Sequence, residues 1–183
     1  AERDCPDVEL LTVRPVETAL AELAAARGLG RLAFEAQEVT VERHAALAAT
    51  EGLAVLVPLG HAVERLRVTK EEEELALLAR ACEITGQAFD RTVTRIRAGM
   101  TERELAVLIE RAMVDAGAEK PAFDTIVASG PNGAIPHHAP GRRCLEPGDM
   151  ITIDCGARYG GYHADMTRTV MLGQPDAWQR DVY

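Results

Sequence analysis

The sequence predicts an α+β protein in which a small α/β segment precedes a larger region of helices followed by strands. Helical and strand patterns alternate over the first sixty residues. Two consecutive helical patterns are then followed by extended segments, an order typical of α+β domains. Hydrophobic residues make up 47% and charged residues 27% of the 183 residues, a globular balance that argues against disorder.

We place a domain boundary near Gly60, after Pro58. Residues 1–60 are then part of an α/β N-terminal domain, and residues 61–183 form the larger unit. A domain of about 60 residues buries only about 60% of the surface that its unfolded chain exposes. The first segment is therefore expected to pack against another part of the protein or to lack its own beginning.

Four elements are predicted within the first segment. Leucine and alanine at helical spacing, closed by glycines, indicate a helix. Thr40 is a candidate N-cap for a second helix, and apolar runs bounded by turn residues indicate two strands. The predicted elements are a helix over 16–27, a strand over 31–35, a helix over 40–50, and a buried strand over 53–57 that ends at Pro58.

Two consecutive helices follow, each introduced by a capping box, in which each of two side chains accepts a hydrogen bond from the other residue's backbone N–H. Apolar side chains at helical spacing give each helix one buried face, and a glycine ends each helix. The first begins with Thr69 and Glu72, buries Leu75, Leu78, Cys82, Phe89, Val93 and Ile96, and ends at Gly99; the second begins with Thr101 and Glu104, buries Leu105, Leu108, Ile109 and Met113, and ends at Gly117.

Extended segments follow from Pro121 onwards, where the hydrophobic period changes from helical to that of strands. Two of the strands are expected to form a hairpin around Tyr159-Gly160-Gly161. The predicted elements are a strand over 123–128, a tight loop over 129–133, and strands over 150–157 and 162–172.

The charge balance disfavours a nucleic-acid partner. Lys plus Arg is 20 and Asp plus Glu is 29, so the net charge is −9, and the basic residues are not segregated. Aromatic residues are only 4%, which leaves little surface on which bases could stack.

The cysteines and the apolar runs favour a cytoplasmic protein. Cys5, Cys82, Cys144 and Cys155 form no C-x-x-C pair, which is simplest to explain in a reducing compartment. Apolar runs fall short of the ~20 residues of a membrane span, and the first residues do not read as a signal peptide. We therefore expect no membrane partner.

The predicted hairpin brings two carboxylates to one face. If the turn is centred on Tyr159-Gly160, Asp154 lies directly opposite Asp165. If it is centred on Gly160-Gly161, Asp154 faces Thr167 and Asp165 is its diagonal neighbour. Side chains alternate with period two, so both turns place the two carboxylates on the same face.

Two carboxylates in this position repel each other unless something offsets their charge. Directly opposite on a hairpin they are about 5 Å apart, and their repulsion is roughly 3 kcal/mol at an effective dielectric near 20. A divalent cation would reverse the sign, and two cations sharing one carboxylate could activate a water for hydrolysis. In the alternative, one aspartate pairs with Arg158 or Arg168 in solvent.

The histidines do not identify a catalytic group by themselves. His137 and His138 follow the glycine-rich loop as a doublet, and a loop histidine is more often a surface group than a catalyst. His163 shares the face of Asp165, where a solvated neighbour is the simpler interpretation than a ligand. His44 and His61 read as surface residues.

Several stretches after about Arg65 carry a family resemblance: RVTKEEEELALLARACEITGQAF, GMTERELA, FDTIVASGPNGAIPHHAP and EPGDMITIDCGARYGGYHADMTRTVMLG. They resemble the pita-bread metallopeptidases, specifically the branch of Xaa-Pro aminopeptidases and Xaa-Pro dipeptidases (prolidases). The resemblance implies a partial pita-bread catalytic domain, and the first sixty residues resemble the later part of that branch's smaller N-terminal domain. Residues 174–183 resemble the family's continuation into another helix.

Position by position, the resemblance implies that Asp154 is the first carboxylate ligand and that Asp165 bridges two divalent metal ions, commonly Mn, Co or Zn. It also implies that His137 is the catalytic histidine on the substrate side, with His138 as its neighbour. The implied substrate is a proline-containing peptide or dipeptide, cleaved on the N-terminal side of proline, and the implied assembly of the complete protein is a homodimer.

The family takes a further histidine and two glutamates from the second half of its domain, and this sequence ends at Tyr183 before any such segment. We therefore expect the 183 residues alone to hold metal weakly and to be inactive. A partial sequence, a cleaved product that associates with its other half, and a non-catalytic descendant all remain open. A non-catalytic pita-bread binding module and a creatinase-like amidinohydrolase are the alternative functions.

Overall fold

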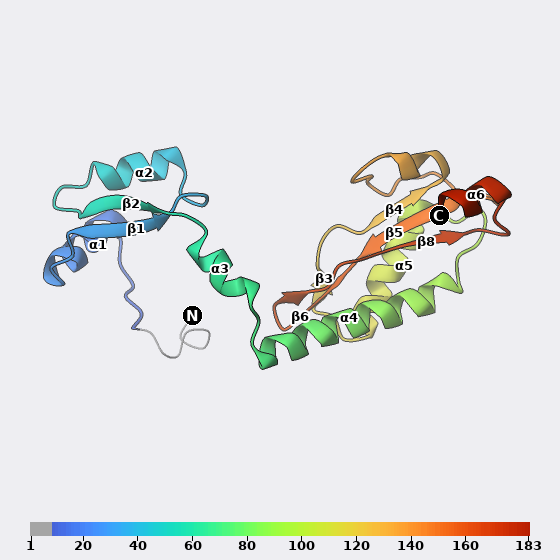
Figure 1. Cartoon of the computed structure of the whole chain (residues 1–183), viewed down its shortest axis with the longest axis horizontal. Coiled ribbons are helices and arrows are strands. Elements are labelled where there is room, and N and C mark those ends of the chain that lie inside the picture. The colour runs from blue at the N-terminus through green and yellow to red at the C-terminus, as the bar shows by residue number, and fades with distance from the viewer. Residues whose placement is uncertain (1–8) are drawn as a thin grey trace. The chain divides into compact units, whose positions relative to one another are not determined.

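The computed structural model describes residues 9–183, and the chain divides into two units, Ala1–Thr69 and Lys70–Tyr183 (Figure 1). The predicted boundary near Gly60 falls before a short helix that belongs to the first unit. Cys5 lies outside the described residues, and the three cysteines within them are free thiols. Among the described residues, no helix is both long enough and apolar enough to span a membrane.

The first unit has the predicted α/β character, with two strands paired in parallel. Its elements are α1 (Val16–Ala26), β1 (Arg31–Glu35), α2 (Val41–Ala48), β2 (Val55–Leu59) and α3 (Ala62–Val68). The register runs from Arg31 opposite Val55 to Glu35 opposite Leu59. Thr40 caps α2 as expected, because its hydroxyl accepts a hydrogen bond from the backbone N–H of Arg43 at 3.2 Å.

Two predictions for this unit were wrong. The second strand continues through Pro58, which lies opposite Phe34, and it is not buried, since Val55 is 67% exposed. A two-stranded sheet consists only of edge strands, where the missing N–H of proline can face outwards. The helix α3 was not predicted at all.

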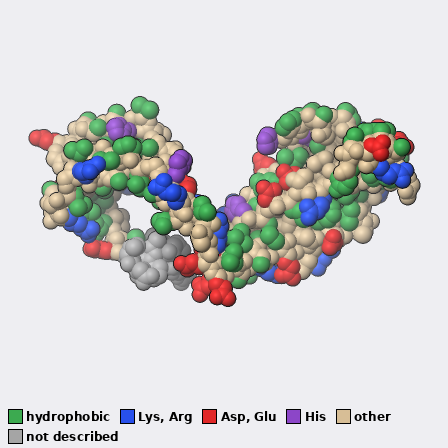
Figure 2. Space-filling view, in the orientation of Figure 1, with side chains coloured by type: hydrophobic (Ala, Val, Ile, Leu, Met, Phe, Trp, Pro, Cys, Tyr) green, Lys and Arg blue, Asp and Glu red, His purple; other side chains and the backbone are tan. Residues whose placement is uncertain are grey.

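The second unit begins with the two expected helices, α4 (Glu72–Val93) and α5 (Glu102–Asp115). The capping box of α5 is confirmed: the Thr101 hydroxyl accepts from the N–H of Glu104 at 3.1 Å, and the Glu104 carboxylate accepts from the N–H of Thr101 at 2.8 Å. The first capping box was misplaced, because Thr69 ends α3 and Glu71 and Glu74 form the box instead. Acidic side chains gather at this end of α4 in Figure 2.

The predicted end of α4 was wrong, and its predicted buried face was correct only in part, since Phe89 packs against the core. The helix ends at Val93 rather than Gly99, and Leu75 and Cys82 are exposed. The residues that it buries are mostly small, namely Ala81, Ile84, Thr85, Ala88 and Thr92. Small side chains allow strand β6 (Ala157–Tyr159) to approach so closely that the Thr85 hydroxyl accepts from the N–H of Ala157 at 3.0 Å.

The strands of the second unit form two antiparallel sheets of three strands each. One has the order β4 (Ile126–Ser129), β5 (Met150–Cys155), β8 (Met166–Met171), and the other has the order β3 (Lys120–Pro121), β6, β7 (Tyr162–His163). The predicted strands over 150–157 and 162–172 are thus each divided in two. The turn is centred on Gly160 and Gly161, whose φ angles are +56° and +82°, so the second of the two predicted registers is the observed one.

The helices cover one face of the β4-β5-β8 sheet (Figure 1). The buried face of α5, with Leu105, Ile109 and Met113, is as predicted, and it packs with Val127, Ile151 and Ile153 of the sheet. Along β5, buried and half-buried residues alternate, so Asp154 points to the side opposite the core. The chain also forms η1 (Gly130–Ala134) after β4 and the expected final helix, α6 (Ala177–Val182).

Candidate functional site

A cavity of about 680 Å³ lies beside the strands of the second unit. Three stretches of chain supply its lining: the segment that leads into β4, the loop that follows η1, and the hairpin. The lining residues are Phe123, Asp124, Thr125, Ile126, His137, His138, Ala139, Pro140, Asp154 and Asp165. The fold therefore brings His137, Asp154 and Asp165 to one cavity, whereas His163 is exposed and does not line it.

Asp154 is held by the middle strand of its sheet. It lies opposite Ile126 of β4 and opposite Thr167 of β8, and the Thr167 hydroxyl donates a hydrogen bond to its carboxylate at 2.8 Å. The next residue, Cys155, points into the core, where burial and the nearby charge of Asp154 raise the pKa of its thiol to about 12.

Asp165 lies exposed between β7 and β8, where the paired strands are interrupted. The alternative in which Arg158 or Arg168 pairs with one of the aspartates does not occur in the described part of the chain. Arg158 lies 3.2 Å from the carboxylate of Glu119, and Arg168 donates to the backbone carbonyl of Thr167 at 2.8 Å. Asp154 and Asp165 therefore have no arginine partner among the described residues.

His137 has an unusual backbone conformation. Its φ is +54°, in the left-handed region, and its side chain is exposed at the cavity. For a residue other than glycine, this conformation costs on the order of 1–3 kcal/mol and persists only where the surrounding structure enforces it. Something near His137 must therefore hold the loop.

The loop is fastened to one buried carboxylate, that of Glu102, which has no exposed surface. Glu102 is the first residue of α5. Its Oε1 accepts from the Ser129 N–H at 2.9 Å, the Ser129 hydroxyl at 2.7 Å and the Asn132 amide at 2.9 Å, and its Oε2 pairs with His138 Nε2 at 2.8 Å and accepts from the Gly141 N–H at 3.1 Å.

These donors keep Glu102 ionised. Burial, the largest single influence, raises the pKa of Glu102, but the donors from Asn132, His138 and Ser129 together lower it from its ordinary value of 4.5 to about 2. The Ser129 hydroxyl also accepts from Arg143 at 2.7 Å, and Arg143 holds Asp149 through contacts of 2.6 and 3.0 Å. Burial by itself would raise the pKa of Asp149, but the hydrogen bonds from Arg143 outweigh this effect, so the pKa lies below its ordinary value.

The carboxylates of the cavity are of a kind that suits a divalent cation. Carboxylate oxygens are ligands that hard cations such as Mn²⁺ accept. Within residues 9–183, no three or more His, Cys, Asp or Glu side chains are grouped so that they could hold a metal ion. Asp154 and Asp165 stay the predicted metal ligands, and Asp124 is a third carboxylate that lines the cavity.

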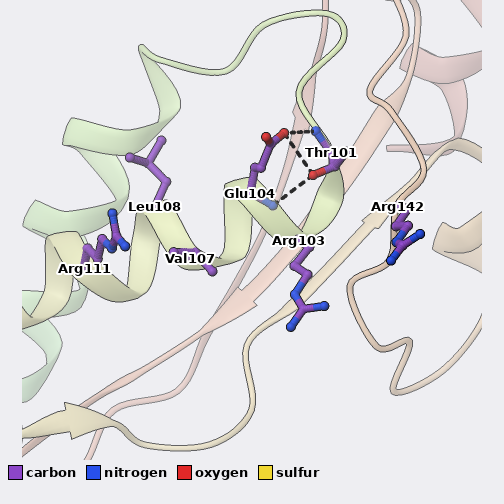
Figure 3. A pocket seen from close by; sticks show the side chains of 7 residues that line it. All are labelled: Thr101, Arg103, Glu104, Val107, Leu108, Arg111 and Arg142. Atoms are coloured by element: carbon purple, nitrogen blue, oxygen red, sulfur yellow. Dashed lines mark hydrogen bonds between the residues drawn. The ribbon is translucent and has the colours of Figure 1, made fainter.

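A second cavity, of about 400 Å³, lies along α5 (Figure 3). Arg103, Arg111 and Arg142 line it together with the apolar Val107 and Leu108. Its one acidic side chain, Glu104, is engaged in the capping box with Thr101, as the dashed lines in Figure 3 show. This cavity lacks a pair of metal-ligating or acid–base groups, so the cavity of Asp154 and Asp165 is the candidate site.

The chain is similar in sequence to known proteins of one family. Residues 76–183 match the model of metallopeptidase family M24. The chain is 43% identical over 121 residues to an Xaa-Pro dipeptidase of Pyrococcus furiosus, a match that covers 66% of this chain and 35% of that protein. It is 38% identical over 156 residues to the uncharacterized peptidase YqhT of Bacillus subtilis, covering 85% and 44%.

Solved structures of related proteins have the same fold as this chain. The X-Pro aminopeptidase from Thermotoga maritima superposes with a TM-score of 0.87 at 37% identity, over 96% of this chain and 49% of that one. The predicted fold class is thereby confirmed, a partial pita-bread domain preceded by part of a smaller α/β domain. The chain spans half or less of the length of these relatives.

One residue of the site was missed in the sequence. An acidic residue in the first turn of a helix is ordinarily a solvated group that favours the helix dipole, and nothing in the spacing of Glu102 distinguishes it from its neighbours. Its importance comes from complete burial under a loop 27 to 39 residues further along the chain.

Proposed function

The chain belongs to metallopeptidase family M24, and on this basis we propose that the whole protein uses divalent metal ions to hydrolyse the peptide bond on the N-terminal side of proline. One observation carries the proposal: Asp154 and Asp165 line the same cavity without an arginine partner in the described part of the chain. The similarity to an Xaa-Pro dipeptidase supports the choice of substrate.

In this proposal Asp154 and Asp165 would hold the metal ions, and Asp165 would be the ligand shared by two. Mn, Co and Zn are the candidate metals. Divalent ions would polarise the scissile carbonyl and lower the pKa of the attacking water. Thr167 orients the carboxylate of Asp154 through its 2.8 Å hydrogen bond, which leaves the other oxygen of Asp154 available to a metal.

His137 acts on the substrate. It lines the cavity from the loop that follows η1, whereas the carboxylates come from the hairpin. From this position it donates a hydrogen bond to the carbonyl oxygen of the scissile bond. Negative charge builds on that oxygen as water attacks, so a positioned donor stabilises the transition state more than the substrate.

For the whole protein we further propose a cytoplasmic homodimer that acts on proline-containing peptides or dipeptides and needs neither nucleic acid nor a membrane. The 183 residues alone would supply only part of the site and would be inactive. The net charge of −9 supports a small peptide rather than a polyanion as the partner.

Two other functions compete with this proposal. A pita-bread binding module has no need for two unpaired carboxylates in one cavity, and these favour the enzyme. A creatinase-like amidinohydrolase shares the two-domain layout, and only its products distinguish it. Assaying the whole protein on an Xaa-Pro dipeptide and on creatine, with free proline and urea as the readouts, separates the three.

The site assignment is tested by Asp165→Asn in the whole protein. We expect loss of Xaa-Pro hydrolysis and of the second metal ion, with an unchanged circular dichroism spectrum, because one negative charge is removed from an exposed position. Asp90→Asn, the same chemical change on the exposed side of α4, is the control and should keep full activity. Full activity of Asp165→Asn would contradict the assignment of Asp165 as a metal ligand.

A further inference from the structure

We propose that Glu102 and His138 are positioning residues that latch the loop of His137 in its active conformation. This inference rests on the proposed function only for what His137 does to a substrate. The latch itself is a matter of structure: one buried carboxylate, two ends of one loop, and a strained residue between them.

Glu102 is a rigid anchor. It begins α5, directly after the capping-box residue Thr101, and its backbone N–H donates to the carbonyl of Arg143 at 3.1 Å. The helix behind it is fixed by Leu105 and Ile109, both fully buried in the core. A carboxylate mounted in this way cannot follow the loop if the loop moves.

The two carboxylate oxygens of Glu102 bind opposite ends of the loop. Oε1 holds the beginning, through Ser129 and Asn132, and Oε2 holds the end, through His138 and Gly141. A carboxylate only accepts hydrogen bonds, so Nε2 of His138 must carry a hydrogen. The contact therefore fixes both the tautomer and the ring orientation of His138.

His137 lies next to this anchored ring. With φ at +54°, its backbone would relax towards negative φ if the loop were released, and the side chain would turn relative to the cavity. The hydrogen bond between His138 and Glu102 is the nearest side-chain contact in sequence that opposes this relaxation. The buried carboxylate of Glu102 thus fixes the position of the catalytic histidine, His137, by holding its neighbour His138.

Glu102→Gln tests the charge with almost no change in volume. Each oxygen of Glu102 faces at least two donors, so whichever way the carboxamide is placed, its NH₂ group opposes N–H or O–H donors. Because Glu102 is fully buried, His138→Ala is a second variant that breaks only one contact, at a side chain that is 15% exposed. Glu104→Gln, two residues further along α5, is the matched control.

The experiment measures two quantities on the whole protein. Hydrogen exchange followed by mass spectrometry reports the protection of Ser129–Gly141, and steady-state kinetics on an Xaa-Pro dipeptide give kcat and KM. In Glu102→Gln and His138→Ala we expect faster exchange in this segment, normal metal content, and a kcat lower by about ten- to a hundredfold with KM little changed. Glu104→Gln should leave both the exchange of this segment and kcat unchanged.

A partial rescue separates positioning from general loss of stability. His138→Gln keeps an N–H donor for Glu102 and should recover part of the protection and of kcat relative to His138→Ala. Unchanged protection of the segment in both Glu102→Gln and His138→Ala would overturn the latch, as would faster exchange with unchanged kcat. If the wild-type protein does not cleave Xaa-Pro bonds, the proposed function fails, and the exchange data alone decide whether the latch exists.

Discussion

At the scale of single residues, the two adjacent histidines should differ in what their loss does. His137→Ala removes the proposed donor to the carbonyl oxygen, a contribution commonly worth about 3 kcal/mol, so the rate should fall by roughly a hundredfold or more while metal content stays normal. His138→Ala removes only a contact to Glu102 and should cost less. The measurement is kcat/KM with metal content determined in parallel.

The opposite order of effects would leave the fold intact but would show that the wrong member of the pair was chosen. The exposure of the two side chains supports the choice, because His137 is exposed at the cavity while His138 is engaged with a buried carboxylate.

Glu102 should make stability depend on pH in the acid range. Its pKa is about 2 in the folded protein and 4.5 ordinarily, so its contribution is fully present above pH 4.5 and is lost as the pH falls towards 2. The shift corresponds to about 3 kcal/mol. The denaturant midpoints of wild type and Glu102→Gln, measured without metal, should converge as the pH is lowered from 6 to about 3, and a constant gap would contradict this account.

At the scale of elements, the hairpin depends on one glycine. A Cβ at Gly156 would lie 1.9 Å from the carbonyl oxygen and 2.8 Å from the carbonyl carbon of Ala164, both backbone atoms that cannot move aside. Gly156→Ala should therefore destabilise the protein by at least about 1–3 kcal/mol and displace the neighbouring Asp165, so that metal binding weakens too.

Gly86→Ala is the control for that substitution, with an effect of opposite sign. Gly86 lies within α4, and a Cβ there would meet nothing within 4 Å. Alanine should stabilise the helix by roughly 0.5–1 kcal/mol. Equal effects of the two substitutions on the thermal midpoint would show that the close approach at Gly156 does not constrain the hairpin.

At the scale of the whole molecule, the 183 residues alone should bind manganese weakly. Two carboxylates leave most coordination positions to water, and among residues 9–183 no group of three or more His, Cys, Asp or Glu side chains could hold a metal ion. Calorimetric titration should give a dissociation constant weaker than about 10⁻⁴ M. Tight binding would mean that other side chains of this chain complete a different site.

Local chemistry determined much of this protein in its sequence. The capping box at Thr101, the buried face of α5 and the strand over 31–35 depend on residues a few positions apart, and all three are as predicted. The even-length turn predicts Asp154 and Asp165 on one face in either register, and both residues line one cavity. Motif spacing carried the family resemblance, and with it the fold.

Only the tertiary structure decided the rest, because it depends on segments distant in the sequence that approach each other closely. The small residues of α4 became its buried face because β6 packs against them, and Pro58 could stay within a strand because that strand is an edge. The register of the hairpin is the one that places its turn on Gly160 and Gly161. Glu102 became the anchor of the His137 loop because folding buries it beneath donors from Ser129 to Gly141, a property that no local pattern encodes.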